Sequence, residues 1–254
     1  MYKPIPRDFD CLVVSDLHLG APNCHAGDFL RFMDWSLAPR LIIAGDLFEH
    51  DRFHSLDRSD LRVIETLRSY ARTNSVTWVR GNHDPSDRDC KSILGLTTRD
   101  ETIIESDRAR YLVKHGHEWD PSMKLSWLVS TADVCYQAAQ AIDRSHRLAR
   151  FLKRKCKRLT RTVDTLQRRA VEEARRRCFD GVIVGHTHQA RDTRHDGVHY
   201  LNSGCWTENP SSFIGIRDGV TRHYFWDHQA HQPAAIECDA LPSPCEPTLV
   251  LEAT

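Results

Sequence analysis

The sequence lacks several features that mark specialised classes of protein. None of its 254 residues belong to a run of about 18 apolar residues, which a membrane-spanning helix requires, and its first eight residues, MYKPIPRD, contain no apolar signal region. Its nine cysteines are an odd number and include no Cys-x-x-Cys pair. In a chain of this length that pattern favours reduced thiols over a disulfide framework, so we expect a cytoplasmic protein, in solution or on the inner face of a membrane.

The sequence also lacks a net charge, because 35 Lys and Arg balance 35 Asp and Glu. Nothing in the overall charge therefore points to nucleic acid. The balance is uneven, since residues 144–177 hold 14 basic and 3 acidic side chains, a local charge of +11 that leaves −11 elsewhere.

Glycine and proline are absent from residues 122–180, 59 residues in all. Two apolar stripes at helical spacing cross this segment, one from Leu125 to Ile142 and one from Leu148 to Ala174, and they predict two or three inserted helices.

Short apolar runs alternate with helical patterns before this segment, the helices being expected at residues 28–37 and 56–73. This alternation predicts an α/β layer architecture with a largely parallel first sheet. After the segment we expect strands at 198–201, 213–216 and 221–226, the last two joined by a hairpin turn at Asp218-Gly219.

The domain organisation that follows is a single α/β domain of residues 1–228 interrupted by a helical insertion at about 122–180. Residues 229–254 contain four prolines and few apolar residues, so we expect a loosely ordered C-terminal tail there.

Five apolar runs each end in side chains that can bind a metal. Ligands gather at the carboxyl ends of strands in α/β folds, which would bring these side chains together. The set comprises two carboxylates, one amide oxygen and four imidazoles: Asp16, His18, Asp46, Asn82, His115, His186 and His188. A lone Gly-Asp or His-x-His is common by chance, but five coincident strand ends are not. Seven ligands suit two adjacent metals that share a carboxylate, and ligands of this kind favour Mn, Fe, Co or Zn.

The residues at these strand ends resemble, in order, the five motifs of the calcineurin-like metallophosphoesterases. The motifs here are Asp16-Leu17-His18, Gly45-Asp46, Gly81-Asn82-His83-Asp84, His115-Gly116-His117 and Gly185-His186-Thr187-His188. The resemblance covers residues 11 to about 226 and implies a four-layer αββα sandwich with the insertion as a helical cap. It also implies that one metal is held by Asp16, His18, Asp46 and His188. The other would be held by Asp46, Asn82, His115 and His186, so that Asp46 bridges the pair.

Two-metal chemistry predicts that a water between the ions is acidified to hydroxide and attacks phosphorus in line, while the metals neutralise the growing charge. His83 is the predicted acid for the leaving oxygen, with Asp84 holding its tautomer, although Asp84 could equally be a turn residue beside Pro85. Arg80 is a candidate phosphate clamp, but in a strand it could equally face away.

The substrate prediction depends on the insertion. A long basic helical insertion between the His115 and Gly-His-Thr-His motifs is similar to that of the UDP-2,3-diacylglucosamine hydrolases of lipid A synthesis. In that family the insertion caps the metals and shelters acyl chains, and cleavage of a pyrophosphate bond gives UMP and a lipid monophosphate. Gly45-Asp46-Leu47-Phe48-Glu49 also resembles that family's second motif, whereas the best known members carry Arg in place of His83. Just after the His115 ligand and around the start of the cap, His117, Trp119 and Lys124 are predicted substrate contacts, with ordinary loop packing as the alternative.

The basic helices allow contact with an anionic membrane and its lipids, with a nucleic acid backbone, or with solvent alone. We favour lipid, because a local +11 exceeds what solubility requires. The sequence therefore predicts a dinuclear hydrolase, with Mn as the favoured metal, that acts on a UDP-2,3-diacylglucosamine-like lipid nucleotide. A nuclease or cyclic-nucleotide phosphodiesterase on the same scaffold is the alternative. A non-catalytic interaction module would be expected to lose ligands, and all seven are present.

Overall fold

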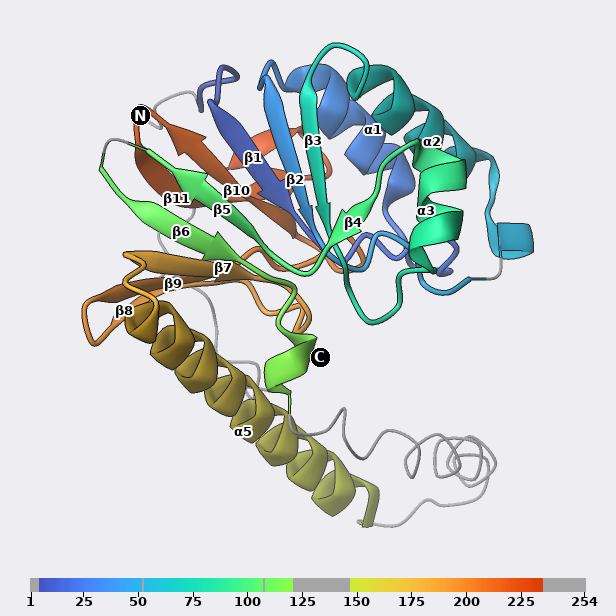
Figure 1. Cartoon of the computed structure of the whole chain (residues 1–254). Helices are drawn as coiled ribbons and strands as arrows, with labels where there is room; N and C mark the ends of the chain where they lie inside the picture. Colours follow the sequence, from blue (N-terminus) through green and yellow to red (C-terminus); the bar gives the residue numbers. More distant parts are fainter. Residues whose placement is uncertain (1–4, 52, 107, 121–146, 235–254) are drawn as a thin grey trace, which may run out of the picture.

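Two β-sheets lie face to face at the centre of the computed structural model, which describes residues 5–51, 53–106, 108–120 and 147–234 (Figure 1). The first sheet has seven strands in the order β12-β11-β10-β1-β2-β3-β4, and the second has five in the order β5-β6-β7-β9-β8. The strands of the first are β1 (Cys11–Val14), β2 (Arg40–Ala44), β3 (Ser75–Val79), β4 (Thr98–Arg99), β10 (Ser211–Arg217), β11 (Val220–Asp227) and β12 (Gln232–Ala234). Those of the second are β5 (Thr102–Glu105), β6 (Arg110–Val113), β7 (Gly181–Val184), β8 (Arg191–His195) and β9 (Val198–Asn202).

Both sheets are mixed. Strands β1 to β4 run parallel to one another, and β10, β11 and β12 add to them in antiparallel pairs. In the second sheet β6, β7 and β9 are parallel, with β5 and β8 antiparallel at the edges. The parallel strands of each sheet therefore end at a common edge, which is where the predicted ligands follow them.

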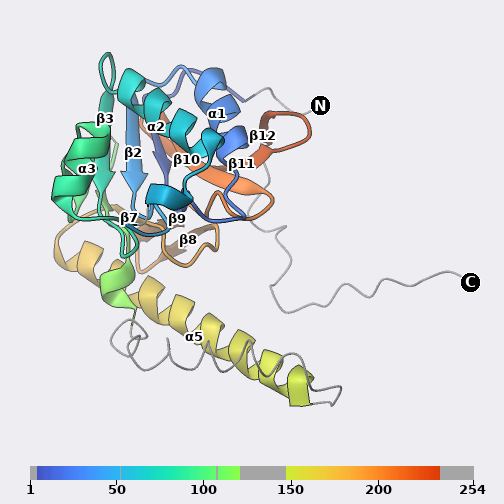
Figure 2. The same ribbon diagram turned by 90° about the vertical axis from the view of Figure 1, so that its right-hand side faces the viewer.

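Helices cover the outer faces of the two sheets. Helices α1 (Ala26–Trp35), α2 (Arg58–Tyr70) and α3 (Asp87–Leu94) lie over the larger sheet, and α5 (Arg147–Arg176) runs beneath the smaller one (Figure 2). Two single-turn helices, η1 (Phe53–Ser55) and η2 (His117–Trp119), lie in the connections. The predicted four-layer α/β sandwich is confirmed.

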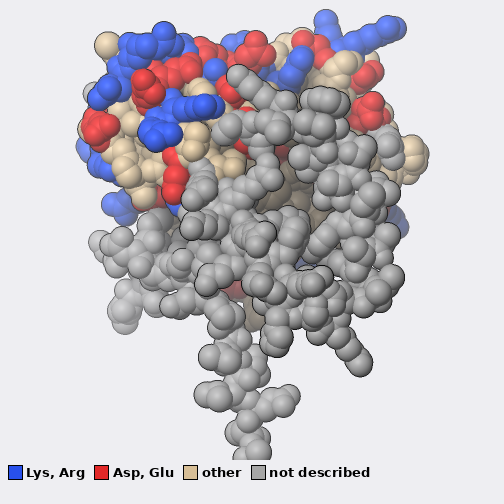
Figure 3. All heavy atoms as spheres, turned by 90° about the horizontal axis from the view of Figure 1, so that it is seen from below, with Lys and Arg blue, Asp and Glu red and all other residues tan. Residues whose placement is uncertain are grey.

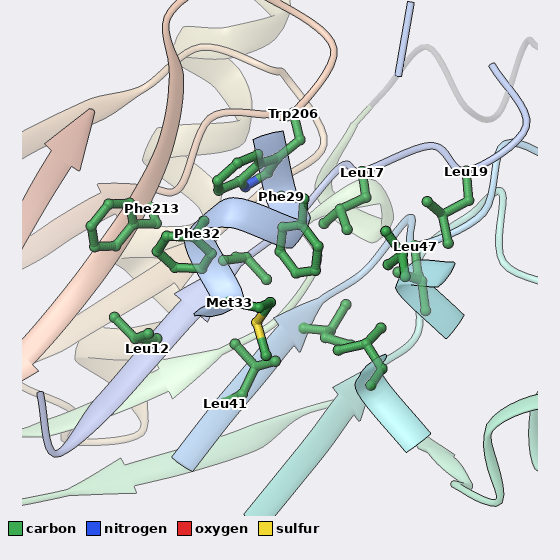
Figure 4. Packing of buried hydrophobic residues seen from close by; sticks show 14 of the residues in the cluster. Leu12, Leu17, Leu19, Phe29, Phe32, Met33, Leu41, Leu47, Trp206 and Phe213 are labelled. Carbon is green, nitrogen blue, oxygen red and sulfur yellow. The ribbon is translucent and has the colours of Figure 1, made fainter. Parts of the chain in front are cut away.

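The central strands are buried on both faces, and their successive side chains point alternately to the helices and to the other sheet. In β1, Leu12 and Val14 pack with the helices, whereas Cys11 and Val13 pack with residues of the second sheet. Figure 4 shows the helix side, where Phe29, Phe32 and Met33 of α1 lie among Leu12 and Leu41 of the strands and the aromatic rings of Trp206 and Phe213.

The two predicted helices of the first half are confirmed with shifts of a few residues at their ends. Helix α2 begins where it does because Asp57 caps it, accepting from the backbone N–H groups of Ser59 and Asp60, while the Asp60 carboxylate accepts from the Asp57 N–H. The Asp218-Gly219 turn is also confirmed: both residues have positive φ, 50° and 71°, as a two-residue hairpin turn requires, and they join β10 to β11.

The predicted helical insertion is not only a cap, because its carboxyl half packs on the second sheet. Its second apolar stripe forms a single 30-residue helix, α5, whose Leu166, Ala170 and Ala174 pack on Val182 and Tyr200 of the second sheet. The carboxyl half of α5 is thus the fourth layer of the sandwich as well as part of the inserted segment. The first stripe, residues 125–142, lies outside the described residues.

The segment predicted as a C-terminal tail begins with a strand, because β12 pairs with β11 through Phe225 and Ala234. Residues 235–254 lie outside the described ranges. Within those ranges, no helix combines the length and the apolar character needed to cross a membrane. On the face seen from below, the described Lys, Arg, Asp and Glu side chains are interspersed rather than segregated by sign (Figure 3).

Candidate metal centre

The loops that follow five parallel strands carry the seven predicted ligands. Asp16 and His18 follow β1, Asp46 follows β2 and Asn82 follows β3, whereas His115 follows β6 and both His186 and His188 follow β7. The two sheets therefore contribute ligands from facing edges, and the structure brings the side chains into two adjacent groups.

The first group consists of Asp16, His18 and His188, whose ligand atoms lie within 4.8 Å of one another. The two Nε2 atoms of His18 and His188 are 3.1 Å apart, and His188 Nε2 lies 3.4 Å from Asp16 Oδ1. Asp16 is fully buried and His18 nearly so, whereas the side chain of His188 is 31% exposed, so the group reaches from the interior to the surface.

The second group consists of Asp46, His115 and His186, again within 4.8 Å. His115 Nε2 lies 3.1 Å from Asp46 Oδ2 and 3.2 Å from Asn82 Oδ1. The same Asp46 oxygen is 3.9 Å from His18 Nε2 in the first group. Asp46 thus lies between the two groups, as a bridging carboxylate must.

The backbone of the centre is enriched in an uncommon conformation, since five of the nine described non-glycine residues with positive φ are predicted ligands. Positive φ angles between 51° and 68° occur at five of the predicted ligands: Asp16, His18, Asp46, His186 and His188. Such conformations are uncommon for residues other than glycine and are retained where the surrounding structure requires them, often at functional sites.

The electrostatics of the centre favour added positive charge. Burial alone would raise the pKa of Asp16, but hydrogen bonds from His18 and His188 and the charges of His115 and His188 outweigh it and hold that pKa well below its usual range. Conversely, burial would lower the pKa of His115, but the charges of Asp46 and Asp16 raise it to about 9. His115 thus gains positive charge that balances the buried carboxylates. Divalent cations would supply the same balance, and imidazole and carboxylate donors suit Mn, Fe, Co or Zn, so the residues fit a metal pair.

His83 lies beside the first group, its ring centroid 5.1 Å from that of His18. Its Nδ1 is 2.8 Å from the carbonyl oxygen of Glu49, and its backbone N–H donates to Asp46 Oδ1 at 2.8 Å. The side chain is exposed, as a group that meets substrate must be. Its role as an acid stays a prediction.

Asp84 does not hold the tautomer of His83, so that prediction is wrong. Its carboxylate instead accepts five N–H groups at 2.8 to 3.2 Å, four from the backbone of Asp46, Leu47, Phe48 and Gly81 and one from the indole of Trp78. Asp84 fixes the loop that carries Asp46.

Two predicted substrate residues face elsewhere. The Arg80 guanidinium pairs with Asp87 at 2.5 Å and donates to Thr98, so the prediction of a phosphate clamp is wrong. Trp119 is buried in the cluster between α5 and the second sheet and donates to Glu173 at 3.0 Å, so its alternative, packing, is the correct interpretation. His117 does lie at the centre, with ring centroids 5.5 Å from His115 and 6.4 Å from His186. Lys124 lies outside the described residues.

Two carboxylates at the centre have no role predicted from the sequence. Glu49 contacts Nδ1 of His18, and Asp120 contacts Nε2 of His186. Glu49 closes the Gly45–Glu49 motif and Asp120 follows the His117 turn, so their places beside the motifs are the signal that could have found them.

The sequence profile of the calcineurin-like phosphoesterase superfamily domain matches residues 10–214. No curated protein matches the chain significantly. Among solved structures, a Vps29 mutant from Entamoeba histolytica is 16% identical, with a TM-score of 0.49 over 88% of this chain and 95% of that one. The phosphoesterase YfcE from E. coli is 20% identical, with a TM-score of 0.47 over 80% and 86% of the two chains. An archaeal phosphodiesterase is 16% identical, with a TM-score of 0.44 over 85% and 98%.

Proposed function

Because the chain belongs to the calcineurin-like phosphoesterase superfamily, we propose that it is a metal-dependent hydrolase of phosphoester or phosphoanhydride bonds. The observation that carries the proposal is the position of Asp46, whose Oδ2 lies 3.1 Å from His115 and 3.9 Å from His18, between two groups of metal-type ligands.

The residues that would hold the metals follow from the two groups. Asp16, His18 and His188 would hold one ion, Asn82, His115 and His186 the other, and Asp46 both. When bound, two such ions lower the pKa of a water and offset the charge that develops on phosphoryl oxygens. Mn is the metal we favour.

The chain itself supplies a proton to the leaving oxygen through His83. Because Nδ1 of His83 donates to the Glu49 carbonyl oxygen, Nε2 is the nitrogen that exchanges a proton with substrate. The Asp46 carboxylate accepts from the His83 backbone N–H, so the acid and the bridging ligand are held in one fixed relation.

For the substrate we propose a UDP-2,3-diacylglucosamine-like lipid nucleotide, cleaved at its pyrophosphate. The inserted helix α5 supports this choice, since its Glu173 accepts from Trp119, which is only a few residues along the chain from His115 and His117. The proposed membrane contact rests on the basic sequence of the insertion.

The test of hydrolysis compares wild type with D46N, using p-nitrophenyl phosphate and bis(p-nitrophenyl) phosphate in the presence of Mn²⁺, Fe²⁺, Co²⁺ or Zn²⁺. We expect kcat/KM to fall roughly 10³-fold in D46N. D192N, which removes a carboxylate from His199 on β8 and β9, is the matched control and should retain activity. A wild type without hydrolysis under every metal, or an active D46N, would refute the assignment.

The test of substrate is release of UMP from a UDP-2,3-diacylated glucosamine. Hydrolysis of the lipid nucleotide at a higher kcat/KM than that of DNA or cyclic nucleotides supports the proposal. Salt-dependent cleavage of nucleic acid with the lipid nucleotide untouched would replace it with a nuclease.

A further inference from the structure

Each imidazole that binds a metal through one nitrogen has a second, outer nitrogen whose partner sets the orientation of the ring. His115 Nδ1 lies 2.8 Å from the carbonyl oxygen of Ala44, and His188 Nδ1 lies 3.5 Å from the hydroxyl of Thr207. These partners are neutral. The other two histidines, one in each group, have carboxylate partners.

Glu49 is the partner in the first group. Its Oε2 lies 2.6 Å from His18 Nδ1, an ion-pair contact that is not aligned as a hydrogen bond, and His18 Nε2 lies 3.1 Å from His188 Nε2. The backbone brings Glu49 there, because the loops after β1 and β2 pair: Leu19 donates to Leu47 at 2.9 Å, and Glu49 donates to Leu19 at 3.1 Å. These backbone hydrogen bonds hold the main chain of Glu49 beside the loop that carries His18.

Asp120 is the partner in the second group. Its Oδ2 lies 2.9 Å from His186 Nε2, so Nδ1 is the nitrogen of His186 left for a metal. The Asp120 side chain is 8% exposed. Its place is fixed by the turn before it, since Asp120 donates to the His117 carbonyl oxygen at 3.1 Å, and Arg169 of α5 donates to the carbonyl of Trp119 at 3.0 Å.

We infer that Glu49 and Asp120 are positioning residues, each orienting one histidine, and that they set the metal affinities of the two halves of the centre separately. A carboxylate on the outer nitrogen fixes the tautomer and ring orientation and makes the other nitrogen a better donor to the metal. The inference rests on the metal-binding part of the proposed function and is independent of hydrolysis.

The test titrates metal-free full-length protein with Mn²⁺, by calorimetry and by electron paramagnetic resonance, which reports whether two ions are coupled. We expect wild type to bind two ions. E49Q should weaken one of them about 10- to 100-fold and leave the other unchanged, and D120N should weaken the second in the same way.

A double-mutant comparison assigns each effect to its histidine. In an H18A background E49Q should cause no further loss of affinity, whereas in an H186A background it should cause its full loss; D120N should show the reverse. The control is D192N, which removes a carboxylate 2.6 Å from His199 Nε2 in β9, an imidazole outside both groups. It should leave both Mn²⁺ affinities unchanged.

A structural role predicts a different pattern. If either variant weakened both sites equally and lowered the melting temperature of the metal-free protein, the inference would be wrong. It would also be wrong if both affinities were unchanged, or if wild type bound no Mn²⁺. Two bound ions without any phosphoester hydrolysis would refute the proposed function while leaving this inference intact.

Discussion

Gly81 lies so close to Asp46 that a Cβ atom on it would overlap both the carboxylate and the backbone nitrogen of Asp46. Gly185 stands in the same relation to the carboxylate of Asp16. Both glycines precede a predicted ligand, and neither has a positive φ. What requires glycine at these positions is therefore the space taken by ligands from another strand and not an unusual backbone conformation.

G81A should accordingly displace Asp46 and with it the carboxylate shared by both halves of the centre. We expect Mn²⁺ affinity to fall at both sites by at least about 10-fold, the loss typical of disturbed ligand support. The matched control is G27A on α1, where a Cβ would meet only the far end of Arg31, and where alanine should stabilise the helix by about 0.5–1 kcal/mol. Isothermal titration with Mn²⁺ measures the first effect and urea unfolding the second. Unchanged Mn²⁺ affinity in G81A would contradict the prediction.

Asp84 should be required for stability rather than for proton transfer. In wild type the N–H donors meet a carboxylate, whereas D84N keeps one acceptor oxygen and presents an NH₂ group to the other donors. We therefore expect a loss of about 2–4 kcal/mol in the free energy of unfolding. D87N, which breaks the exposed pair with Arg80, should cost less than about 1 kcal/mol. Urea unfolding of metal-free wild type, D84N and D87N measures these losses. Equal stability of D84N and wild type would disprove the structural role of Asp84.

The ligand positions are predictable because they depend on chain-local signals. A buried apolar run followed by a polar ligand identifies a strand end, and parallel strands of one sheet must present those ends at one edge, so this rule groups Asp16 with Asp46. His115 follows a strand of the second sheet, and only the resemblance of the motifs places it with them. The prediction of the Asp218-Gly219 turn is confirmed for the same reason, because the geometry of the turn is set by these two adjacent residues.

The partners of side chains are not predictable in this way. Asp84 and His83 are adjacent in sequence, yet the Asp84 carboxylate binds a loop 36 to 38 residues away. Trp119 follows a ligand closely, but its indole meets Glu173, 54 residues further on. Such pairings depend on how elements pack, and neither motif spacing nor periodicity carries that information.

His223 should make the protein less stable in acid. Burial lowers the pKa of this β11 side chain to about 4, only partly opposed by the charge of Asp192, whereas an unfolded histidine titrates near 6.5. Between these values the unfolded chain binds the extra proton, so stability falls as pH drops through 6.5 toward 4, by about 3 kcal/mol in total.

Comparison with H223Q isolates this contribution from those of other groups. Urea unfolding of metal-free wild type and H223Q at pH 7, 5.5 and 4.5 should show wild type losing about 2–3 kcal/mol more than the variant. Parallel pH profiles for the two proteins would show that His223 does not titrate in this range.

Trp119 and His117, both predicted from sequence to contact substrate, should now behave differently. The Trp119 indole donates to Glu173 and packs between α5 and the second sheet, so W119F should lower the free energy of unfolding by about 1 kcal/mol while leaving KM within about twofold of wild type. His117 is partly exposed beside His115 and His186, so H117A should raise KM for a phosphoester substrate without a comparable loss of stability. Steady-state kinetics and urea unfolding of both variants separate the two roles. A raised KM with unchanged stability in W119F would return Trp119 to the substrate site, because packing alone predicts the opposite pair of results.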